Sequence, residues 1–237
     1  RSIRHGYADM ALAGGSEESV NPICIAGFAN LGALAKVDDP TQASLPFDER
    51  RCGFVAGEGA GAVVLESLEH ALARGAKPLA EITGFGSTGD AYHMTAPEPS
   101  GEGIQRAMLQ ALSEGGFTPA DLGHVNAHGT ATPANDSTES HALLALCGEE
   151  AGRKVPVVSV KGSTGHTLGA AGAVEAIVTA LSVANECVPP TTGFAQPDPD
   201  CPVNVLTEAK TGYPQKVALS NSLGFGGHNA VLAISPC

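Results

Sequence analysis

Residues 155–185 read VPVVSVKGSTGHTLGAAGAVEAIVTALSVAN. The β-branched run Val155–Val160 predicts a buried strand. The segment Leu168–Asn185 predicts a helix, because apolar residues recur there at the i, i+3, i+4, i+7 spacing of one helical face: Val174, Ile177, Val178 and Leu181. A strand and a helix joined by a short glycine-containing loop are typical of α/β proteins.

The same alternation continues on both sides of this stretch. Further strands are predicted over Ala8–Gly14, Gly53–Leu65, Leu79–Phe85, His124–Ala127, Val217–Ser222 and Ala230–Ser235. Further helices are predicted over Pro22–Ala35, Glu66–Arg74, Gly101–Gly115 and Asp136–Cys147, the last opening with Asp136 and Glu139 at capping-box spacing. The fold class is therefore predicted to be α/β.

The composition is that of a compact folded protein of 237 residues, with 43% hydrophobic and 16% charged side chains. The 13 basic and 25 acidic side chains give a net charge of −12, which disfavours a nucleic acid partner. Aromatic residues make up only 4% of the chain and Trp is absent, so stacking platforms for single-stranded nucleic acid are not expected. The longest apolar stretch, Ala176–Ala184, is too short to span a membrane.

The six cysteines form no CxxC pair, so we expect reduced thiols in the cytoplasm and no metal site. A disulfide or zinc framework is the less favoured alternative. The opening residues, Arg1–Gly6, have the pattern of a last helical turn closed by glycine. We therefore expect the chain to be a fragment that lacks an N-terminal segment.

Three segments predict a ligand site, because each follows a strand with a loop of His, Gly or Thr residues: 126–133, 160–166 and 221–229. Ligands of α/β proteins bind at the carboxyl ends of sheet strands. His128, His166 and Lys161 are therefore expected to gather around one reacting centre. A turn-capping role is the plainer interpretation for either His alone.

The positions of these residues suggest their chemistry. His166 precedes the predicted helix, whose dipole disfavours imidazolium, and Lys161 would act in the same direction by charge repulsion. A neutral imidazole can donate an N–H to a developing oxyanion. Glu175 could pair with Lys161 or could be an ordinary solvated glutamate, and the loop Gly224–Gly227 offers backbone N–H groups.

Other site classes lack their motifs. The sequence has no G-x-S-x-G nucleophile elbow. The glycine-rich stretch Gly57–Gly61 leads into a strand rather than a helix, so it is not a dinucleotide fingerprint. The loop after Val160 lacks the GK[ST] ending of a nucleotide-binding P-loop.

The three loops, in this order, resemble those of the β-ketoacyl-acyl carrier protein synthases, particularly the type II elongation synthases. Supporting stretches are Leu12–Glu17, Pro46–Asp48, Gly53–Val55, Gly57–Gly61 and Asp90–Thr95. The resemblance implies a thiolase-like fold, a five-layered α-β-α-β-α sandwich of two related halves. Residues 1–78 would be the end of the first half, and residues 79–237 the second half.

The resemblance also implies roles for individual residues. The catalytic set would be His128, His166, Lys161, Glu175 and the gate residue Phe225. The substrate's phosphopantetheine arm and acyl chain would contact Thr130, Thr132, Thr95, Phe54 and Phe28. No cofactor is expected, since the substrate arrives on the phosphopantetheine of acyl carrier protein.

The sequence departs from the family pattern at several positions. The family's nucleophilic Cys would lie in the helix that ends at Arg1–Gly6, so it is expected upstream of Arg1. Cys52 stands where Asp is common, Asn135 where Gly is frequent and His228 where Thr is usual. These departures leave the two histidines and the lysine in place.

The resemblance implies a decarboxylative condensation of malonyl-acyl carrier protein with an acyl-enzyme thioester, by a homodimer. Residues 1–237 alone are expected not to condense acyl chains, because their thiols lie outside the family's nucleophile motif. Two alternatives are a polyketide ketosynthase and a non-catalytic partner similar to a chain-length factor.

Overall fold

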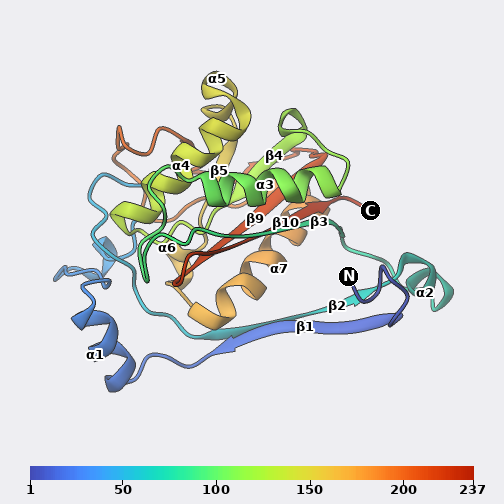
Figure 1. The fold of residues 1–237 in the computed structure, drawn as a ribbon, viewed down its shortest axis with the longest axis horizontal. Coiled ribbons are helices and arrows are strands. Elements are labelled where there is room, and N and C mark those ends of the chain that lie inside the picture. Colours follow the sequence, from blue (N-terminus) through green and yellow to red (C-terminus); the bar gives the residue numbers. More distant parts are fainter.

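The computed structural model describes residues 1–237 and is built around a six-stranded mixed sheet (Figure 1). Its strands, in spatial order, are β3 (Glu81–Gly89), β10 (His228–Ser235), β9 (Val217–Gly224), β4 (Leu122–Asn126), β5 (Pro156–Val158) and β7 (Asn204–Val205). The second strand, β10, runs antiparallel to both of its neighbours, β3 and β9, whereas β9, β4, β5 and β7 are mutually parallel. The carboxyl ends of β4 and β5 therefore meet at one edge of the sheet.

Helices cover both faces of this sheet. Helices α3 (Glu102–Glu114) and α4 (Pro133–Cys147) lie on one face, and α7 (Ala171–Ala184) lies on the other. Figure 1 shows α7 between the large sheet and a second, two-stranded sheet of β1 (Met10–Glu17) and β2 (Gly59–Glu66). The layers run α-β-α-β, so the α/β class is confirmed.

The face under α3 is the apolar core. Side chains of α3 pack there against side chains of β4, β9 and β10. The residues in this contact include Ile104, Met108 and Leu112 of α3 and Val125, Leu219 and Val231 of the strands. A Cβ at Gly84 or Gly86 of β3 would lie 1.9 Å from the carbonyl oxygen of Ala111 or Ala107. Glycine at these two positions lets the backbone of α3 rest directly on the strand.

The remaining elements are short. They are the helices α1 (Pro22–Asn30), α2 (Leu68–Ala73), α5 (Glu149–Gly152) and α6 (Lys161–Thr164), the 3-10 turns Pro40–Gln42, Pro119–Asp121 and Leu168–Ala170, and the pair β6 (Cys187–Val188) and β8 (Lys210–Thr211). No helix has both the length and the apolar character that a membrane span requires.

The predicted elements are present, but several boundaries were wrong. Helix α1 ends at Asn30 rather than Ala35, because Gly32 takes a left-handed φ of +68°. The strand predicted from Gly53 starts only at Gly59, where pairing with β1 begins. Residues Arg1–Gly6 do form a helical turn closed by Gly6, with Tyr7 N donating to Ser2 O at 2.9 Å.

The capping box expected at the start of α4 was also wrong. The helix begins at Pro133 after Thr132. The Asp136 carboxylate accepts instead from Phe47 N at 2.7 Å, and Glu139 accepts from the backbone of His128 at 2.9 Å. Both carboxylates thus fix loops from elsewhere in the chain rather than their own helix.

The buried face of α7 differs from the predicted one. Its buried residues are Ala171, Glu175, Thr179, Ser182 and Val183. The apolar side chains predicted to face the core, Val174, Ile177 and Val178, are only half-buried, and Leu181 is 43% exposed. The helix therefore turns a largely polar face toward the six-stranded sheet.

Candidate active site

The buried ammonium group of Lys161 lies at the centre of the candidate site. Lys161 begins α6 and is 1% exposed. Its Nζ forms a salt bridge with Glu175 of α7, also 1% exposed, and donates to the His128 carbonyl oxygen at 2.6 Å. The same Nζ lies 3.3 Å from His128 Nδ1. The segments after β4 and β5 and the helix α7 thus converge on one cation.

The imidazole rings of His128 and His166 lie edge to face, with centroids 5.1 Å apart. The backbone N–H of Leu168 donates to His166 Nδ1 at 3.2 Å, so the proton of a neutral His166 sits on Nε2. The ammonium group beside His128 Nδ1 favours the same tautomer in that ring. Each ring therefore has an Nε2–H group available to a ligand.

Burial keeps both imidazoles neutral near pH 7. It lowers the pKa of His166 to about 3, and the charge of Lys161 acts in the same direction. Burial, Lys161 and then His166 lower the pKa of His128 well below its ordinary value of 6.5. The effect of Lys161 was predicted from the sequence, but the larger effect of burial was not. Burial also raises the pKa of Glu175 to about 7, which the Lys161 charge partly counteracts.

Glu139 is a site residue that the sequence analysis missed. Its buried carboxylate accepts from the backbone N–H groups of His128 and Gly129 at 2.9 and 3.0 Å, and from Asn221 Nδ2 at 3.0 Å. These bonds tie α4 and β9 to the loop that carries the histidine. One signal was available, because Glu139 precedes the apolar pair Ala142 and Leu143 at i+3 and i+4 on the same helical face.

An aromatic row leads away from the imidazoles. The ring centroids of Phe54 and His166 are 5.2 Å apart, and those of Phe28 and Phe54 are also 5.2 Å apart. The expected acyl-contacting residues Phe28 and Phe54 are thus brought together with His166.

Thr130 and Thr132 form a hydroxyl pair on the loop that carries His128. Their Oγ1 atoms lie 2.9 Å apart, with Thr130 buried and Thr132 half-buried. Ala131 between them takes a left-handed φ of +66°, and its carbonyl oxygen accepts from Gly53 N at 3.0 Å. The two hydroxyls are therefore held in a fixed arrangement close to the catalytic loop.

Phe225 and Thr95 lie in a separate pair of loops. Phe225, at the turn between β9 and β10, is 49% exposed and makes no aromatic contact with the row. Its backbone N–H donates to no protein acceptor, whereas Gly226 N donates to Met94 O at 2.7 Å. Thr95 bonds through its own N–H to His93 Nδ1 and not to Thr130 or Thr132. A hydrogen bond joins these two loops to each other, and none joins either of them to His128 or His166.

The six cysteines are free thiols, and none forms a hydrogen bond to His128 or His166. No group of three His, Cys, Asp or Glu residues is arranged to hold a metal ion. The observed site thus consists of two imidazoles and a buried ammonium group, and no cysteine is hydrogen-bonded to them.

Two family models match successive parts of the chain. The model of the β-ketoacyl synthase N-terminal domain matches residues 1–71, and that of the C-terminal domain matches residues 79–195. The chain belongs to the β-ketoacyl synthase family. The domain boundary expected at residue 78 stays a prediction.

Curated members of the family match over nearly the whole chain. A 3-oxoacyl-[acyl-carrier-protein] synthase 2 of Synechocystis sp. is 47% identical over 234 residues, which cover 98% of this chain and 56% of the relative. The protein of the same name from Staphylococcus aureus strain COL is 49% identical over 230 residues, 97% of this chain and 55% of the relative. The chain thus spans about half the length of the curated relatives it matches.

Solved structures of ketosynthases share the fold over all of this chain. A type II polyketide ketosynthase, solved in complex with its acyl carrier protein, has a TM-score of 0.96 at 38% identity, with 58% of that chain covered. A β-ketoacyl synthase from Burkholderia phymatum has a TM-score of 0.92 at 38% identity, with 57% covered. The similarity confirms the thiolase-like architecture expected from the sequence.

Proposed function

We propose that the protein is a 3-oxoacyl-acyl carrier protein synthase that extends fatty acids by decarboxylative Claisen condensation. The observation that carries this proposal is the pair of neutral imidazoles, each with a free Nε2–H, held around the Lys161 ammonium group. Relatives that are 47% and 49% identical carry the name 3-oxoacyl-[acyl-carrier-protein] synthase 2.

The imidazole pair suits the decarboxylation step. The thioester carbonyl oxygen of a malonyl group accepts hydrogen bonds from the Nε2–H groups of His128 and His166. As the carbon–carbon bond to the carboxylate breaks, carbon dioxide leaves and the electron pair passes into an enolate. Donors already oriented toward that oxygen stabilise its growing charge without reorganisation. Burial, together with the charge of Lys161, keeps both rings neutral, so that they donate protons in hydrogen bonds without transferring them.

The condensation step needs an acyl group on a thiol. We place that thiol outside residues 1–237, in the same chain or in a partner, since no cysteine here bonds to either imidazole. The enolate carbon attacks the acyl thioester, a carbon–carbon bond forms and the thiolate leaves. The unpaired N–H of Phe225 is the donor we assign to the intermediate oxyanion. Residues 1–237 alone would then decarboxylate but not condense.

The substrate binds in two parts under this proposal. The phosphopantetheine arm of acyl carrier protein lies along Thr130 and Thr132, with Thr95 at its entrance. The acyl chain follows Phe54 and Phe28, and Phe225 gates access. The working form is a homodimer. A relative solved with its acyl carrier protein supports the choice of partner.

Malonyl-acyl carrier protein decarboxylation by the whole protein tests this function, because that step does not need the thiol. We expect His128→Ala and His166→Ala each to lower the rate about a hundredfold or more, the loss typical of removing one oxyanion donor. His141→Ala, an exposed histidine on α4, is the matched control and should leave the rate unchanged. Equal rates in all four proteins would refute the assignment.

A polyketide ketosynthase is the second candidate, because the solved ketosynthase with a TM-score of 0.96 comes from a type II polyketide synthase. The two functions differ in the acyl group that is extended. Faster condensation of saturated acyl thioesters than of β-ketoacyl thioesters supports the fatty acid synthase, and the reverse order supports the second candidate. A protein that neither decarboxylates nor condenses would fit a chain-length-factor-like partner.

A further inference from the structure

Phe47 has an unusual conformation beneath the catalytic loop. Its side chain is 1% exposed, and its φ of +64° lies in the left-handed region that residues with a Cβ rarely adopt. Nothing in the proposed chemistry uses this residue. A bulky residue keeps such a conformation only where surrounding contacts impose it, and such residues concentrate at functional sites.

A buried carboxylate imposes the conformation. Phe47 N donates at 2.7 Å to Asp136 Oδ2, and Asn135 Nδ2 donates to the other carboxylate oxygen at 3.0 Å. The next residue, Asp48, accepts from the backbone of Ala195 and Gln196 at 2.7 and 2.8 Å. The backbone of Phe47 is thus held on both sides, and the direction of its ring depends on its own side-chain torsions.

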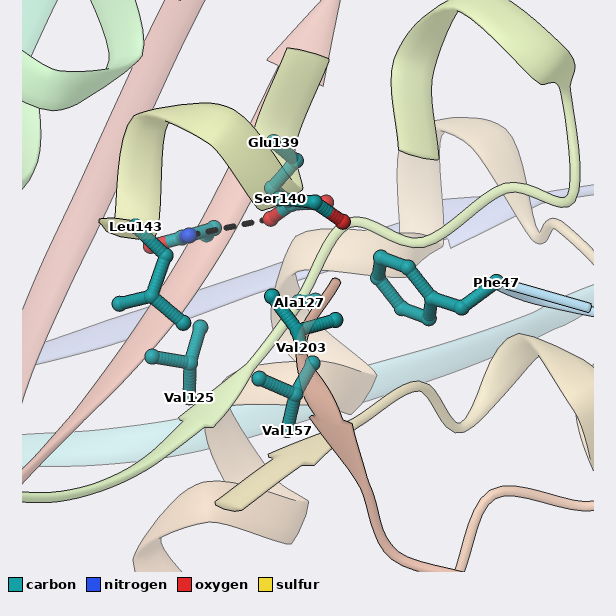
Figure 2. A pocket seen from close by; sticks show the side chains of 9 residues that line it. Phe47, Val125, Ala127, Glu139, Ser140, Leu143, Val157 and Val203 are labelled. Carbon is teal, nitrogen blue, oxygen red and sulfur yellow. Dashed lines mark hydrogen bonds between the residues drawn. The ribbon is translucent and has the colours of Figure 1, made fainter. Parts of the chain in front are cut away.

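That direction leads to the loop carrying His128. A Cβ at Gly129 would lie 2.9 Å from Phe47 Cε2 and 2.6 Å from the Ser159 side chain. Figure 2 shows the Phe47 ring pointing toward Ala127 and Ser140, across a small cavity that Val157 and Glu139 also line. The ring therefore packs against the loop at Gly129.

Polar bonds also hold the same loop. Glu139 accepts from the N–H groups of His128 and Gly129, Ser159 Oγ donates to Gly129 O at 2.7 Å, and Lys161 Nζ donates to His128 O. These four bonds hold the loop by the backbone N–H and carbonyl groups of His128 and Gly129. The Phe47 ring adds a rigid apolar contact at Gly129 that these bonds do not supply.

We propose that Phe47 is a positioning residue for His128: its ring, fixed by the bond from its N–H to Asp136, sets the Ala127–Gly129 turn so that the His128 imidazole faces His166. The catalytic consequence of this placement rests on the proposed function. The position of the His128 ring does not rest on the proposed function. That position can be measured without any turnover of substrate.

The test uses the whole protein labelled with ¹⁵N-histidine. The His128 ring resonances are assigned from their loss in His128→Ala. Phe47→Leu, which removes the ring, should move these resonances and leave those of exposed His141 unmoved. Phe47→Tyr keeps the ring and adds a hydroxyl toward the cavity lined by Ser140 and Glu139, so its His128 resonances should stay near the wild-type positions.

Leu45→Ala is the matched control. Leu45 lies in the same loop, is equally buried and packs near Gly193 instead of Gly129. Its truncation should lower the melting temperature without moving the His128 resonances. Wild-type His128 resonances in Phe47→Leu, or an equal displacement in Leu45→Ala, would overturn the proposal.

Kinetics supply a second readout. Phe47→Leu should lower kcat for malonyl decarboxylation about tenfold with KM within about twofold, since small misplacements of a catalytic group act mainly on the chemical step. Phe47→Tyr should recover most of that loss. A wild-type protein without decarboxylase activity would refute the proposed function, and the resonances would still decide the role of Phe47.

Discussion

The two faces of the six-stranded sheet are packed in different ways, one through apolar contacts and the other through buried polar and charged groups. On the face toward α3, glycines and apolar side chains bring backbone onto backbone, as at Gly84 and Gly86. On the face toward α7, Asn126 Nδ2 of β4 donates to Glu175 O at 3.1 Å and to Thr179 Oγ1 at 3.0 Å, beside the Lys161–Glu175 pair. The apolar face supplies stability through close packing. The polar face buries charge, which costs stability unless every group is paired.

The largest expected effect comes from breaking the charge pair on the polar face. Glu175→Leu leaves the Lys161 ammonium buried and unpaired, so we expect a loss of about 3–5 kcal/mol in the free energy of unfolding. In Lys161→Met/Glu175→Leu both charges are absent, and most of that stability should return. Urea denaturation of the whole protein measures both. A double variant as unstable as the single one would mean that the pair stabilises the fold in its own right.

The apolar face should respond to volume instead of charge. A Cβ at Gly86 would meet Ala107 O at 1.9 Å, so Gly86→Ala must push α3 off the sheet, at a cost of about 3 kcal/mol. Gly89→Ala on the same strand is the control, because its nearest neighbour would be Gly227 O at 4.0 Å. Malonyl decarboxylation should survive in both variants. Similar unfolding free energies for the two would show that α3 does not rest on β3 as described.

Lowering the pH should reduce the stability of the fold through buried groups on the polar face. Burial lowers the pKa of His124 to about 4 from its ordinary 6.5, against the hydrogen bond that its Nδ1–H donates to Gln215 Oε1, which raises it. Above pH 6.5 both folded and unfolded chains hold this imidazole neutral, and the stability it contributes is complete. As the pH falls from about 6.5 to about 4, the unfolded chain takes up the proton first, so stability is lost.

The loss due to His124 amounts to about 2 kcal/mol at pH 5, from about 1.36 kcal/mol for each pH unit. His124→Gln should therefore flatten the dependence of the unfolding free energy on pH between 4.5 and 6. His141→Gln, at an exposed position of α4, should not change that slope. A His124→Gln slope equal to that of the wild type would contradict the assignment of this buried imidazole.

The sequence predicted which residues gather at the candidate site better than it predicted how the helices pack. His128 and Lys161 follow parallel neighbours β4 and β5, so their loops had to meet at one sheet edge, and the structure brings them together. Their catalytic roles stay predictions. The roles of Asp136, Glu139 and Phe47 depend on contacts between distant segments, which no local periodicity encodes. The two carboxylates at capping-box spacing gave a local explanation that the tertiary contacts overrode.

Helix α7 shows why periodicity failed for burial. The apolar pattern treats a helix as having one buried side, but α7 lies between two sheets. Its side toward the large sheet serves Lys161 and Asn126 and is therefore polar, through Glu175 and Thr179. The apolar side meets the smaller β1–β2 pair, where a Cβ at Gly61 would lie 3.0 Å from Ile177.

The smallest expected change in unfolding free energy distinguishes the predicted buried face of α7 from the observed one. Leu181 belongs to the predicted apolar face but is 43% exposed, whereas Val183 lies outside it and is 3% exposed, packed with Ala218 and Ile234. Leu181→Ala should therefore change the unfolding free energy by only about 0.5 kcal/mol, as exposed substitutions usually do. Val183→Ala should cost at least about 1 kcal/mol more, because it leaves a cavity between the helix and the sheet. Urea denaturation of the two variants decides which face of α7 packs on the six-stranded sheet. A larger loss of unfolding free energy in Leu181→Ala than in Val183→Ala would mean that the apolar face predicted from the periodicity, and not the polar face, lies against that sheet.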